Sequence, residues 1–208
     1  MEIQMWREIL APYDLAVQEL VLKFSSLVRE SREAGKYSYI ERVDGRRKEL
    51  SSILDKAKRK GVPIEQVTEK IYDIAGVRLI CEFVEDISKV VDIIRSRPDM
   101  EVVSEKDYIT DEKPSGYRSY HMIIRYEVTT IYGSKKVYAE IQIRTMAMNF
   151  WSTIEHSLQY KYSGNVPDDI SEKLQMAAKS VYNLDNEMSL IRDDIMMAQE
   201  FSYGKARI

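Results

Sequence analysis

The sequence is poor in cysteine and histidine, and these shortages exclude several classes of protein. Its 208 residues include one cysteine, Cys81, so the chain cannot form an intramolecular disulfide framework. The two histidines, His121 and His156, belong to no cluster with zinc-ligand spacing. The chain also has no internal repeat and no low-complexity linker, which favours a single domain over residues 1–208.

Long apolar runs and an excess of basic charge are missing as well. The longest uncharged stretches are too short to span a bilayer, so no membrane partner is expected. Glu2, Arg7 and Glu8 do not fit a signal peptide, which favours a cytoplasmic protein. A formal net charge of -3 gives no general attraction to nucleic acid. A content of 44% hydrophobic and 31% charged residues is ordinary for a soluble globular protein.

Hydrophobic periodicity predicts helices and strands in alternation. A helical arm at 1–34 has apolar residues spaced by three and four positions, and Pro12 is expected to start or kink it. A loop at 35–38 follows the arm. The pattern then predicts helices at 43–60, 86–97 and 146–162, and strands at 75–83, 100–106, 120–129 and 135–145. Gly133 joins the last two strands as a hairpin, and Ser163-Gly164-Asn165 ends the last of these helices.

The C-terminal helix, predicted over 168–200, has the most regular apolar stripe. Its members repeat at four and three residues without interruption: Ile170, Leu174, Ala177, Val181, Leu184, Met188, Ile191 and Ile195. Such a heptad seam either packs on its own domain or joins copies of the chain. Because the N-terminal arm has a similar stripe, we expect an oligomerisation helix.

A strand near the middle of the chain carries three kinds of polar side chain on one face. Residues 138–145 alternate with a period of two. One face is apolar, and the other carries, in order, Tyr138, Glu140, Gln142 and Arg144. A carboxylate, an amide and a guanidinium at every second position can hold a metal, a nucleophile and a phosphate on a rigid floor. Together with the loop at 113–121, this strand predicts a nucleotide-handling site.

The predicted helix at 43–60 has a cationic face. Four of its residues are spaced so that they share one side: Lys48, Ser52, Lys56 and Arg59. Several cations and a hydroxyl on one face can bind a polyphosphate. A solvated basic helix explains the same spacing, so this pattern alone does not decide between the two.

Asp73 comes just before the strand at 75–83, in which Arg78 interrupts an otherwise apolar run. Together with Glu140 on another strand, Asp73 can share a magnesium ion, which takes few protein carboxylates and completes its shell with phosphate oxygens. Taken alone, Asp73 fits a turn or helix-end carboxylate better.

The segment Lys113-Pro-Ser-Gly-Tyr-Arg-Ser-Tyr-His121 leads into the strand at 120–129. Gly116 allows close approach of the backbone, and Tyr117 offers a ring on which a base can stack. A hairpin approach loop with a core histidine explains the same residues. The chain has no His-Asp pair of the kind that metal-dependent phosphohydrolases use, so no hydrolase activity is expected.

Taken in order, these motifs resemble the synthetase domain of the RelA/SpoT homologue family. The matching segments are Gly45-Arg46 with Lys48, Asp73-Ile-Ala-Gly-Val-Arg78, Gly116-Tyr-Arg-Ser-Tyr-His121, Glu140-Ile-Gln-Ile-Arg-Thr145, Asn149-Phe-Trp151, and Glu155-His156 with Tyr160-Lys161. The resemblance spans a catalytic core at 40–162, and both arms resemble those of a stand-alone small alarmone synthetase. It implies an α+β fold with a mixed β-sheet of about five strands flanked by helices, related to nucleotidyltransferases.

The resemblance implies transfer of pyrophosphate from ATP to the 3′-hydroxyl of GMP, GDP or GTP, with release of AMP, by a magnesium-dependent homotetramer. Arg46 and Arg78 would clasp the adenine, and the triphosphate would be held by Lys48, Ser52, Lys56 and Arg59. Asp73 and Glu140 would bind magnesium, with Glu140 also activating the 3′-hydroxyl. Tyr117 would stack on guanine, and the acceptor would be placed by Lys113, Ser115, His121, Gln142 and Asn149.

Four residues depart from the pattern of close relatives. Arg42 and Asp44 stand where such relatives commonly have an aromatic residue and a threonine. Val21 and Ser25 stand where relatives that bind the alarmone in a regulatory cleft commonly have basic residues. Because Asp44 would repel such an anion, we expect weak or absent stimulation by added pppGpp.

Two other functions fit parts of the same pattern. Some family members transfer pyrophosphate to the 3′ end of tRNA, but the acidic balance and the lack of an exposed basic arm argue against this activity. A regulator that binds single-stranded RNA on the same scaffold would not need both Asp73 and Glu140.

Overall fold

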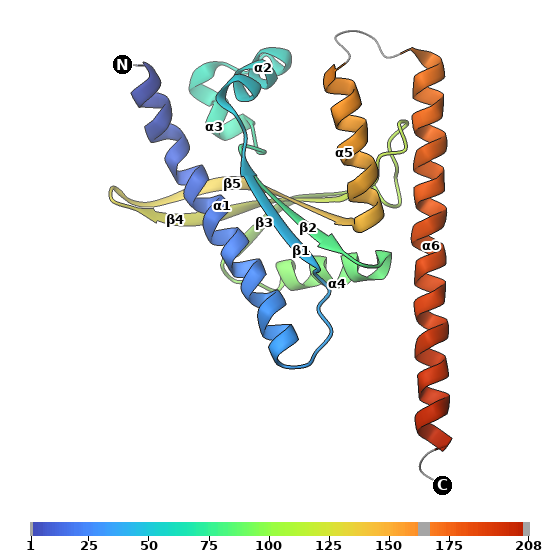
Figure 1. Cartoon of the computed structure of the whole chain (residues 1–208). Helices are drawn as coiled ribbons and strands as arrows, with labels where there is room; N and C mark the ends of the chain where they lie inside the picture. Colours follow the sequence, from blue (N-terminus) through green and yellow to red (C-terminus); the bar gives the residue numbers. More distant parts are fainter. Residues whose placement is uncertain (1, 162–166, 206–208) are drawn as a thin grey trace.

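The computed structural model describes residues 2–161 and 167–205 and contains one mixed β-sheet (Figure 1). The strand order is β1-β2-β5-β4-β3. The bounds along the chain are β1 Arg42–Arg47, β2 Ala75–Cys81, β3 Met100–Asp107, β4 Tyr120–Thr130 and β5 Gly133–Thr145. The pairing of β2 with β5 is parallel, and the other three pairings are antiparallel. The expected α+β fold with a mixed, five-stranded sheet is therefore confirmed.

Helices flank the sheet and extend from both of its ends. Their bounds are α1 Glu2–Glu33, α2 Leu50–Lys60, α3 Val67–Lys70, α4 Val84–Arg95, α5 Met146–Lys161 and α6 Asp168–Lys205, with a 3₁₀ turn at Ile64–Gln66. The α1 helix continues through Pro12, which was expected to start or kink it. Within the described ranges, no helix combines the length and apolarity needed to cross a membrane. The predicted helix end at 163–165 lies outside these ranges.

The prediction of one helix over 43–60 is wrong in its first half. Residues 42–47 form the edge strand β1, paired antiparallel with β2, and the helix α2 begins at Leu50. Lys48 lies between the two elements, where its N–H donates to the Ile74 carbonyl at 2.8 Å. Pairing with β2 outweighs a helical pattern that Gly45 already weakens, because glycine is a poor helix former.

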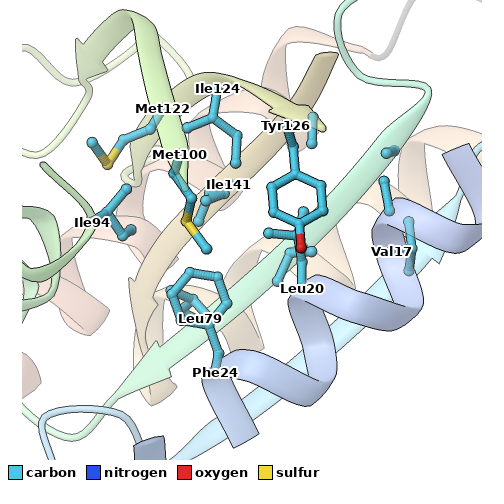
Figure 2. Close-up of a cluster of buried hydrophobic side chains, with 14 of the residues drawn as sticks. Val17, Leu20, Phe24, Leu79, Ile94, Met100, Met122, Ile124, Tyr126 and Ile141 are labelled. Atoms are coloured by element: carbon cyan, nitrogen blue, oxygen red, sulfur yellow. The ribbon is translucent and has the colours of Figure 1, made fainter. Parts of the chain in front are cut away.

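One face of the sheet is apolar and carries the hydrophobic core. Figure 2 shows Leu20 and Phe24 of α1 packed over Leu79, Tyr126 and neighbouring strand residues. Ile94 of α4 joins the same cluster, and all of these side chains are buried. In Figure 1, α2, α3 and α5 lie on the opposite side of the sheet from α4. Because side chains alternate along a strand, the polar residues of β5 face that second side.

The N-terminal helix approaches the sheet closely at one glycine. A Cβ placed on Gly45 of β1 would overlap Val21 Cγ2 and lie 2.9 Å from Val17 Cγ1. Valine side chains are stiff because they branch at Cβ, so neither can move aside without cost. Val21 is therefore a packing residue of α1, which gives this departure from the family pattern a structural reason.

The C-terminal helix packs on its own domain with a face that only partly overlaps the predicted seam, whose members Ile170, Leu174 and Val181 are half-buried. Ala178, Asp185 and Ser189 are buried against the domain. Four members of the seam stay largely exposed, with relative exposures of 46%, 43%, 48% and 54% for Leu184, Met188, Ile191 and Ile195. Of the two alternatives for the seam, packing on its own domain does not apply at these four residues, and the domain contact is partly polar. The exposed stripe remains available to a second chain.

We expect Gly45→Ala to destabilise the fold by about 1–3 kcal/mol through overpacking against Val21 and Val17. Urea unfolding measures this free energy, and the double variant Gly45→Ala/Val21→Ala should recover most of it. Gly76→Ala is the matched control, since its Cβ would meet only the Arg46 carbonyl O, at 3.6 Å. An unchanged free energy of unfolding in Gly45→Ala would show that α1 tolerates the added methyl group.

Candidate active site

Strand register aligns the predicted site residues in two rows across the polar face of the sheet. Paired residues of neighbouring strands share a face. The first row is Arg46, Gly76 and Glu140, and the second is Asp44, Arg78, Gln142 and His121. Gly76 adds no side chain between Arg46 and Glu140, so the floor stays open at that point.

Asp73 lies just before β2 and contacts two lysines. Its Oδ2 lies 3.0 Å from Lys48 Nζ and 2.7 Å from Lys56 Nζ. Burial by itself raises the pKa of Asp73, but the hydrogen bonds and charges of Lys56 and Lys48 outweigh it and hold the pKa below its ordinary value. Asp73 Oδ1 is buried and has no hydrogen-bond partner in the described part of the chain. That oxygen is free to bind a cation.

Glu140 is held by its two neighbours on the sheet. Its Oε1 lies 3.1 Å from His121 Nδ1, and its Oε2 accepts a hydrogen bond from Gln142 Nε2 at 2.8 Å. Burial raises the pKa of Glu140, whereas His121 and Gln142 lower it, and the net direction is downward. The negative charge of Asp73 opposes this lowering, which places the two carboxylates within electrostatic reach of each other. Glu140 is therefore ionised at neutral pH.

A cavity of about 280 Å³ opens over these carboxylates. Its lining comes from β1, the start of β2 and β5: Asp44, Gly45, Arg46, Asp73, Gly76, Val77, Arg78, Glu140 and Gln142. The described residues contain no group of three or more metal-binding side chains. Two carboxylates, one of which has an unpartnered oxygen, fit Mg²⁺, which prefers oxygen ligands and usually keeps waters and substrate phosphates in its shell.

A second cavity, of about 610 Å³, shares Arg46, Arg78 and Gln142 with the first. The rest of its lining is Lys113, Ser115, Tyr117, His121, Arg144, Ser152, Thr153, Glu155 and His156. The Tyr117 hydroxyl lies 2.8 Å from His121 Nε2 and accepts a hydrogen bond from Arg144 Nη2. Lys113 Nζ lies 4.5 Å from the centroid of the Tyr117 ring. A planar base that stacked on this face of the Tyr117 ring would displace the Lys113 ammonium group from it.

Most of the predicted site residues converge on these cavities, but five do not line them. Lys48 and Lys56 contact Asp73 without lining either cavity, and Ser52 and Arg59 are exposed on α2. Asn149 lines a separate cavity beside Arg42 and Phe150, and its buried Oδ1 has no hydrogen-bond partner among the described residues. The role of Asn149 as an acceptor ligand finds no support in this position.

The structure adds residues to which the sequence assigns no role at the site. Arg144 is 5% exposed and donates to Gln142 Oε1 at 2.9 Å and to Ser119 Oγ from Nε at 3.2 Å. The sequence signal for Arg144 is its position on the same face of the strand as Glu140 and Gln142, at every second residue. Four α5 residues also line the second cavity: Ser152, Thr153, Glu155 and His156. The spacing of three and four from Ser152 to Glu155 and His156 is the helical signal for a shared face.

The four residues that depart from the family pattern do not form one pocket within the chain. Asp44 lines the first cavity and accepts a hydrogen bond from Arg42 Nε at 3.1 Å. Val21 packs on the opposite side of β1, against Gly45, and Ser25 is exposed. The Arg42 guanidinium neutralises part of the charge for which repulsion of an anion was expected.

Three guanidinium groups crowd the wall between the two cavities. Burial lowers the pKa of Arg78, and the positive charges of Arg144 and Arg46 lower it further. Arg78 Nε is buried without a hydrogen-bond partner in the described part. Such a cluster is unfavourable by itself and favourable once a polyanion lies against it.

Paired carboxylates beside crowded cations, on the open face of a mixed sheet, define an enzyme that acts on phosphate-rich substrates. The chain belongs to the RelA/SpoT family, because the family model described as "Region found in RelA / SpoT proteins" matches residues 45–165.

Close relatives agree with this assignment over nearly the whole chain. GTP pyrophosphokinase YjbM of Bacillus subtilis is 47% identical over 199 residues, which is 96% of this chain and 94% of the relative. A GTP pyrophosphokinase family protein from Streptococcus pneumoniae superposes with a TM-score of 0.89 at 49% identity, covering 94% of this chain and 96% of that chain.

Small alarmone synthetase 1 of Bacillus subtilis has been solved with its product pppGpp and with AMPCPP. The product complex superposes with a TM-score of 0.89 at 46% identity, over 92% of this chain and 98% of that chain. The AMPCPP complex gives 0.83 at 42% identity, over 93% and 99% of the two chains. The similarity thus extends to both helical arms.

We expect Arg78→Met to raise the free energy of unfolding by about 1 kcal/mol without ligand, because it removes an unsatisfied buried donor and relieves repulsion from Arg46 and Arg144. The same variant should lose stabilisation by inorganic tripolyphosphate, measured as a shift in thermal unfolding. Arg29→Met, on the exposed face of α1, should change neither quantity. Lower stability of Arg78→Met without ligand would contradict this account.

Proposed function

We propose that this chain is a guanosine polyphosphate synthetase. It transfers pyrophosphate from ATP to the 3′-hydroxyl of a guanine nucleotide and releases AMP, in the cytoplasm, where both substrates are available. One observation carries the proposal: two cavities that share Arg46, Arg78 and Gln142, with Glu140 on the floor of the first and hydrogen-bonded to Gln142. Two nucleotides bound side by side would bring their reacting groups together at this shared wall.

The first cavity suits ATP. Arg46 and Arg78 provide flat guanidinium groups against which an adenine can stack. Lys48 and Lys56 lie at the rim beside Asp73, where they neutralise phosphate charge, and the exposed Ser52 and Arg59 extend this cationic face of α2. Asp73 and Glu140 would hold Mg²⁺, which supplies charge neutralisation at the transferred group when it is bound.

The second cavity suits the guanine nucleotide. Tyr117 offers a stacking face, while Lys113, Ser115 and His121 line the space for phosphates and sugar. In the reaction, the 3′-oxygen bonds to the β-phosphorus of ATP as the bond from that phosphorus to the oxygen shared with the α-phosphorus breaks. AMP leaves with that oxygen, and Glu140 accepts the hydroxyl proton. Positioning and charge account for most of the rate, so no covalent intermediate is required.

The decisive test is transfer by purified chain given magnesium, ATP and GMP, GDP or GTP in turn, with products separated by charge. Glu140→Gln should lower kcat about a thousandfold, because it removes an ionised carboxylate from the reacting centre while keeping its shape. The folded state should persist, as judged by circular dichroism. Glu127→Gln, exposed on β4, is the matched control. Full activity in Glu140→Gln would contradict both roles of this residue.

Two other activities remain outcomes of the same assay. Label transferred from ATP to tRNA but not to GDP would identify a tRNA pyrophosphotransferase. Binding of single-stranded RNA with no transfer to any acceptor would identify an RNA-binding regulator. Asp73 and Glu140 favour chemistry over binding alone, because a binding surface has no need to bury two carboxylates.

We also propose that the chain works as a homotetramer joined partly through α6. The exposed seam of Leu184, Met188, Ile191 and Ile195 is a continuous apolar stripe of the coiled-coil kind. Phe150 of α5 is 66% exposed and adds to the apolar surface on this side of the sheet.

Ile191→Asp should therefore shift the particle mass, measured by light scattering after size exclusion, from the tetramer towards smaller species. A buried charge in an apolar interface is costly, and about a tenfold weaker association is expected. Asn186→Asp introduces the same charge on α6 away from the seam and should leave the mass unchanged. A constant mass in both variants would place the interface elsewhere.

A further inference from the structure

The domain-facing side of α6 contacts the segment that carries Tyr117. Gln175 Nε2 donates to the Pro114 carbonyl O at 2.9 Å. One turn along, Ala178 lies so close to Gly116 that a Cβ on Gly116 would overlap its methyl group. In Figure 1 the loop between β3 and β4 reaches α6 at this place. The α6 helix therefore supports, from outside, the segment that lines the second cavity, which we call the acceptor cavity.

A buried ion pair continues the same contact. Asp185 Oδ2 lies 3.2 Å from Arg118 Nη2 and accepts a hydrogen bond from Thr145 Oγ1 at 3.1 Å. Arg118 and Asp185 are 4% and 5% exposed. The Thr145 hydroxyl in turn accepts the Met148 N–H at 3.0 Å, in the first turn of α5. The Asp185 carboxylate thus links α6 to the end of β5, to the start of α5 and to residues 113–121, which we call the acceptor segment.

Backbone geometry also shapes the segment at this contact. The backbone of the segment closes a local turn, with the Gly116 N–H donating to the Lys113 carbonyl at 2.7 Å. Gly116 has a φ of 83°, which glycine adopts without strain. The contacts with α6 fix where this turn stands over the sheet.

We propose that Asp185 is a positioning residue for the acceptor nucleotide, acting through Arg118. Arg118 follows Tyr117 directly, and the two side chains lie in different places: Tyr117 lines the second cavity, whereas Arg118 is buried against Asp185. Anchoring Arg118 in α6 therefore turns the Tyr117 ring towards the cavity. The inference rests on the proposed function, because it takes that cavity to bind a guanine nucleotide. In the described part α6 lines neither cavity, but the segment that it contacts contributes lining residues to the second cavity alone, so the effect is expected on the acceptor and not on ATP.

Steady-state kinetics of Asp185→Asn test the proposal. We expect the KM for GDP to rise about tenfold, because the anchor sets acceptor placement, while the KM for ATP stays within about twofold. A purely structural role would reduce the folded fraction, which lowers the apparent kcat and leaves both KM values unchanged. The exposed Gln175 provides a variant that cannot unfold the core, and Gln175→Ala should raise the KM for GDP about threefold.

Arg192→Met is the matched control. Arg192 joins α6 to α4 through Glu85, at 3.2 Å, and lies over the Phe83 ring, so its loss weakens helix docking without touching the acceptor segment. Its KM for GDP should equal that of the wild type. Unchanged KM values in both Asp185→Asn and Gln175→Ala, or equal rises for both substrates, would overturn the positioning role. An absence of transfer by the wild type would instead overturn the proposed function.

Discussion

The parallel pairing of β2 with β5 is the constraint on which the rest of the site depends. It sets Gly76 beside Glu140 and Arg78 beside Gln142, in a sheet whose other pairings are antiparallel. Because Ala75 pairs with Ala139, Asp73, two residues before Ala75, is thereby brought near Glu140 in the middle of β5. A slip of one residue would turn Glu140 into the core, so the apolar face that packs on α1 and α4 also fixes the position of the carboxylate.

Some charged groups on the polar face of the sheet are neutralised by neighbours, whereas others that line the cavities are not. Lys48 and Lys56 neutralise Asp73, whereas Arg78 stays without a hydrogen-bond partner for its Nε in the described part. The unbalanced groups line the wall that the two cavities share. The clustered guanidinium groups thus lower the stability of the unliganded fold, and a bound polyanion would restore it. This is the usual trade-off between stability and function in an active site.

The sequence predicted the elements that have strong periodicity and the residues that carry rare chemistry. The alternation in β5 identified Glu140 and Gln142, and a carboxylate at a strand entrance identified Asp73. The edge strand β1 was taken for a helix because its pairing with β2 is tertiary and leaves no local pattern. Hydrophobic periodicity does not predict which side of α6 faces the domain, because that side buries Asp185 and Ser189 in place of apolar residues. Asn149 was assigned by resemblance, and the cavity it lines can be known only from the packing of α5.

The parallel pairing also determines when the site can exist during synthesis. A parallel pair requires a long crossover, and here the two strands are separated by α4, β3 and β4 in the chain. Because a chain is synthesised from its N-terminus, Asp73 is made well before β5, which carries the second carboxylate, Glu140. No partly synthesised chain that lacks β5 can therefore assemble the two carboxylates. Contacts between such distant segments form late in folding, so the two carboxylates come together only after most of the sheet has been made.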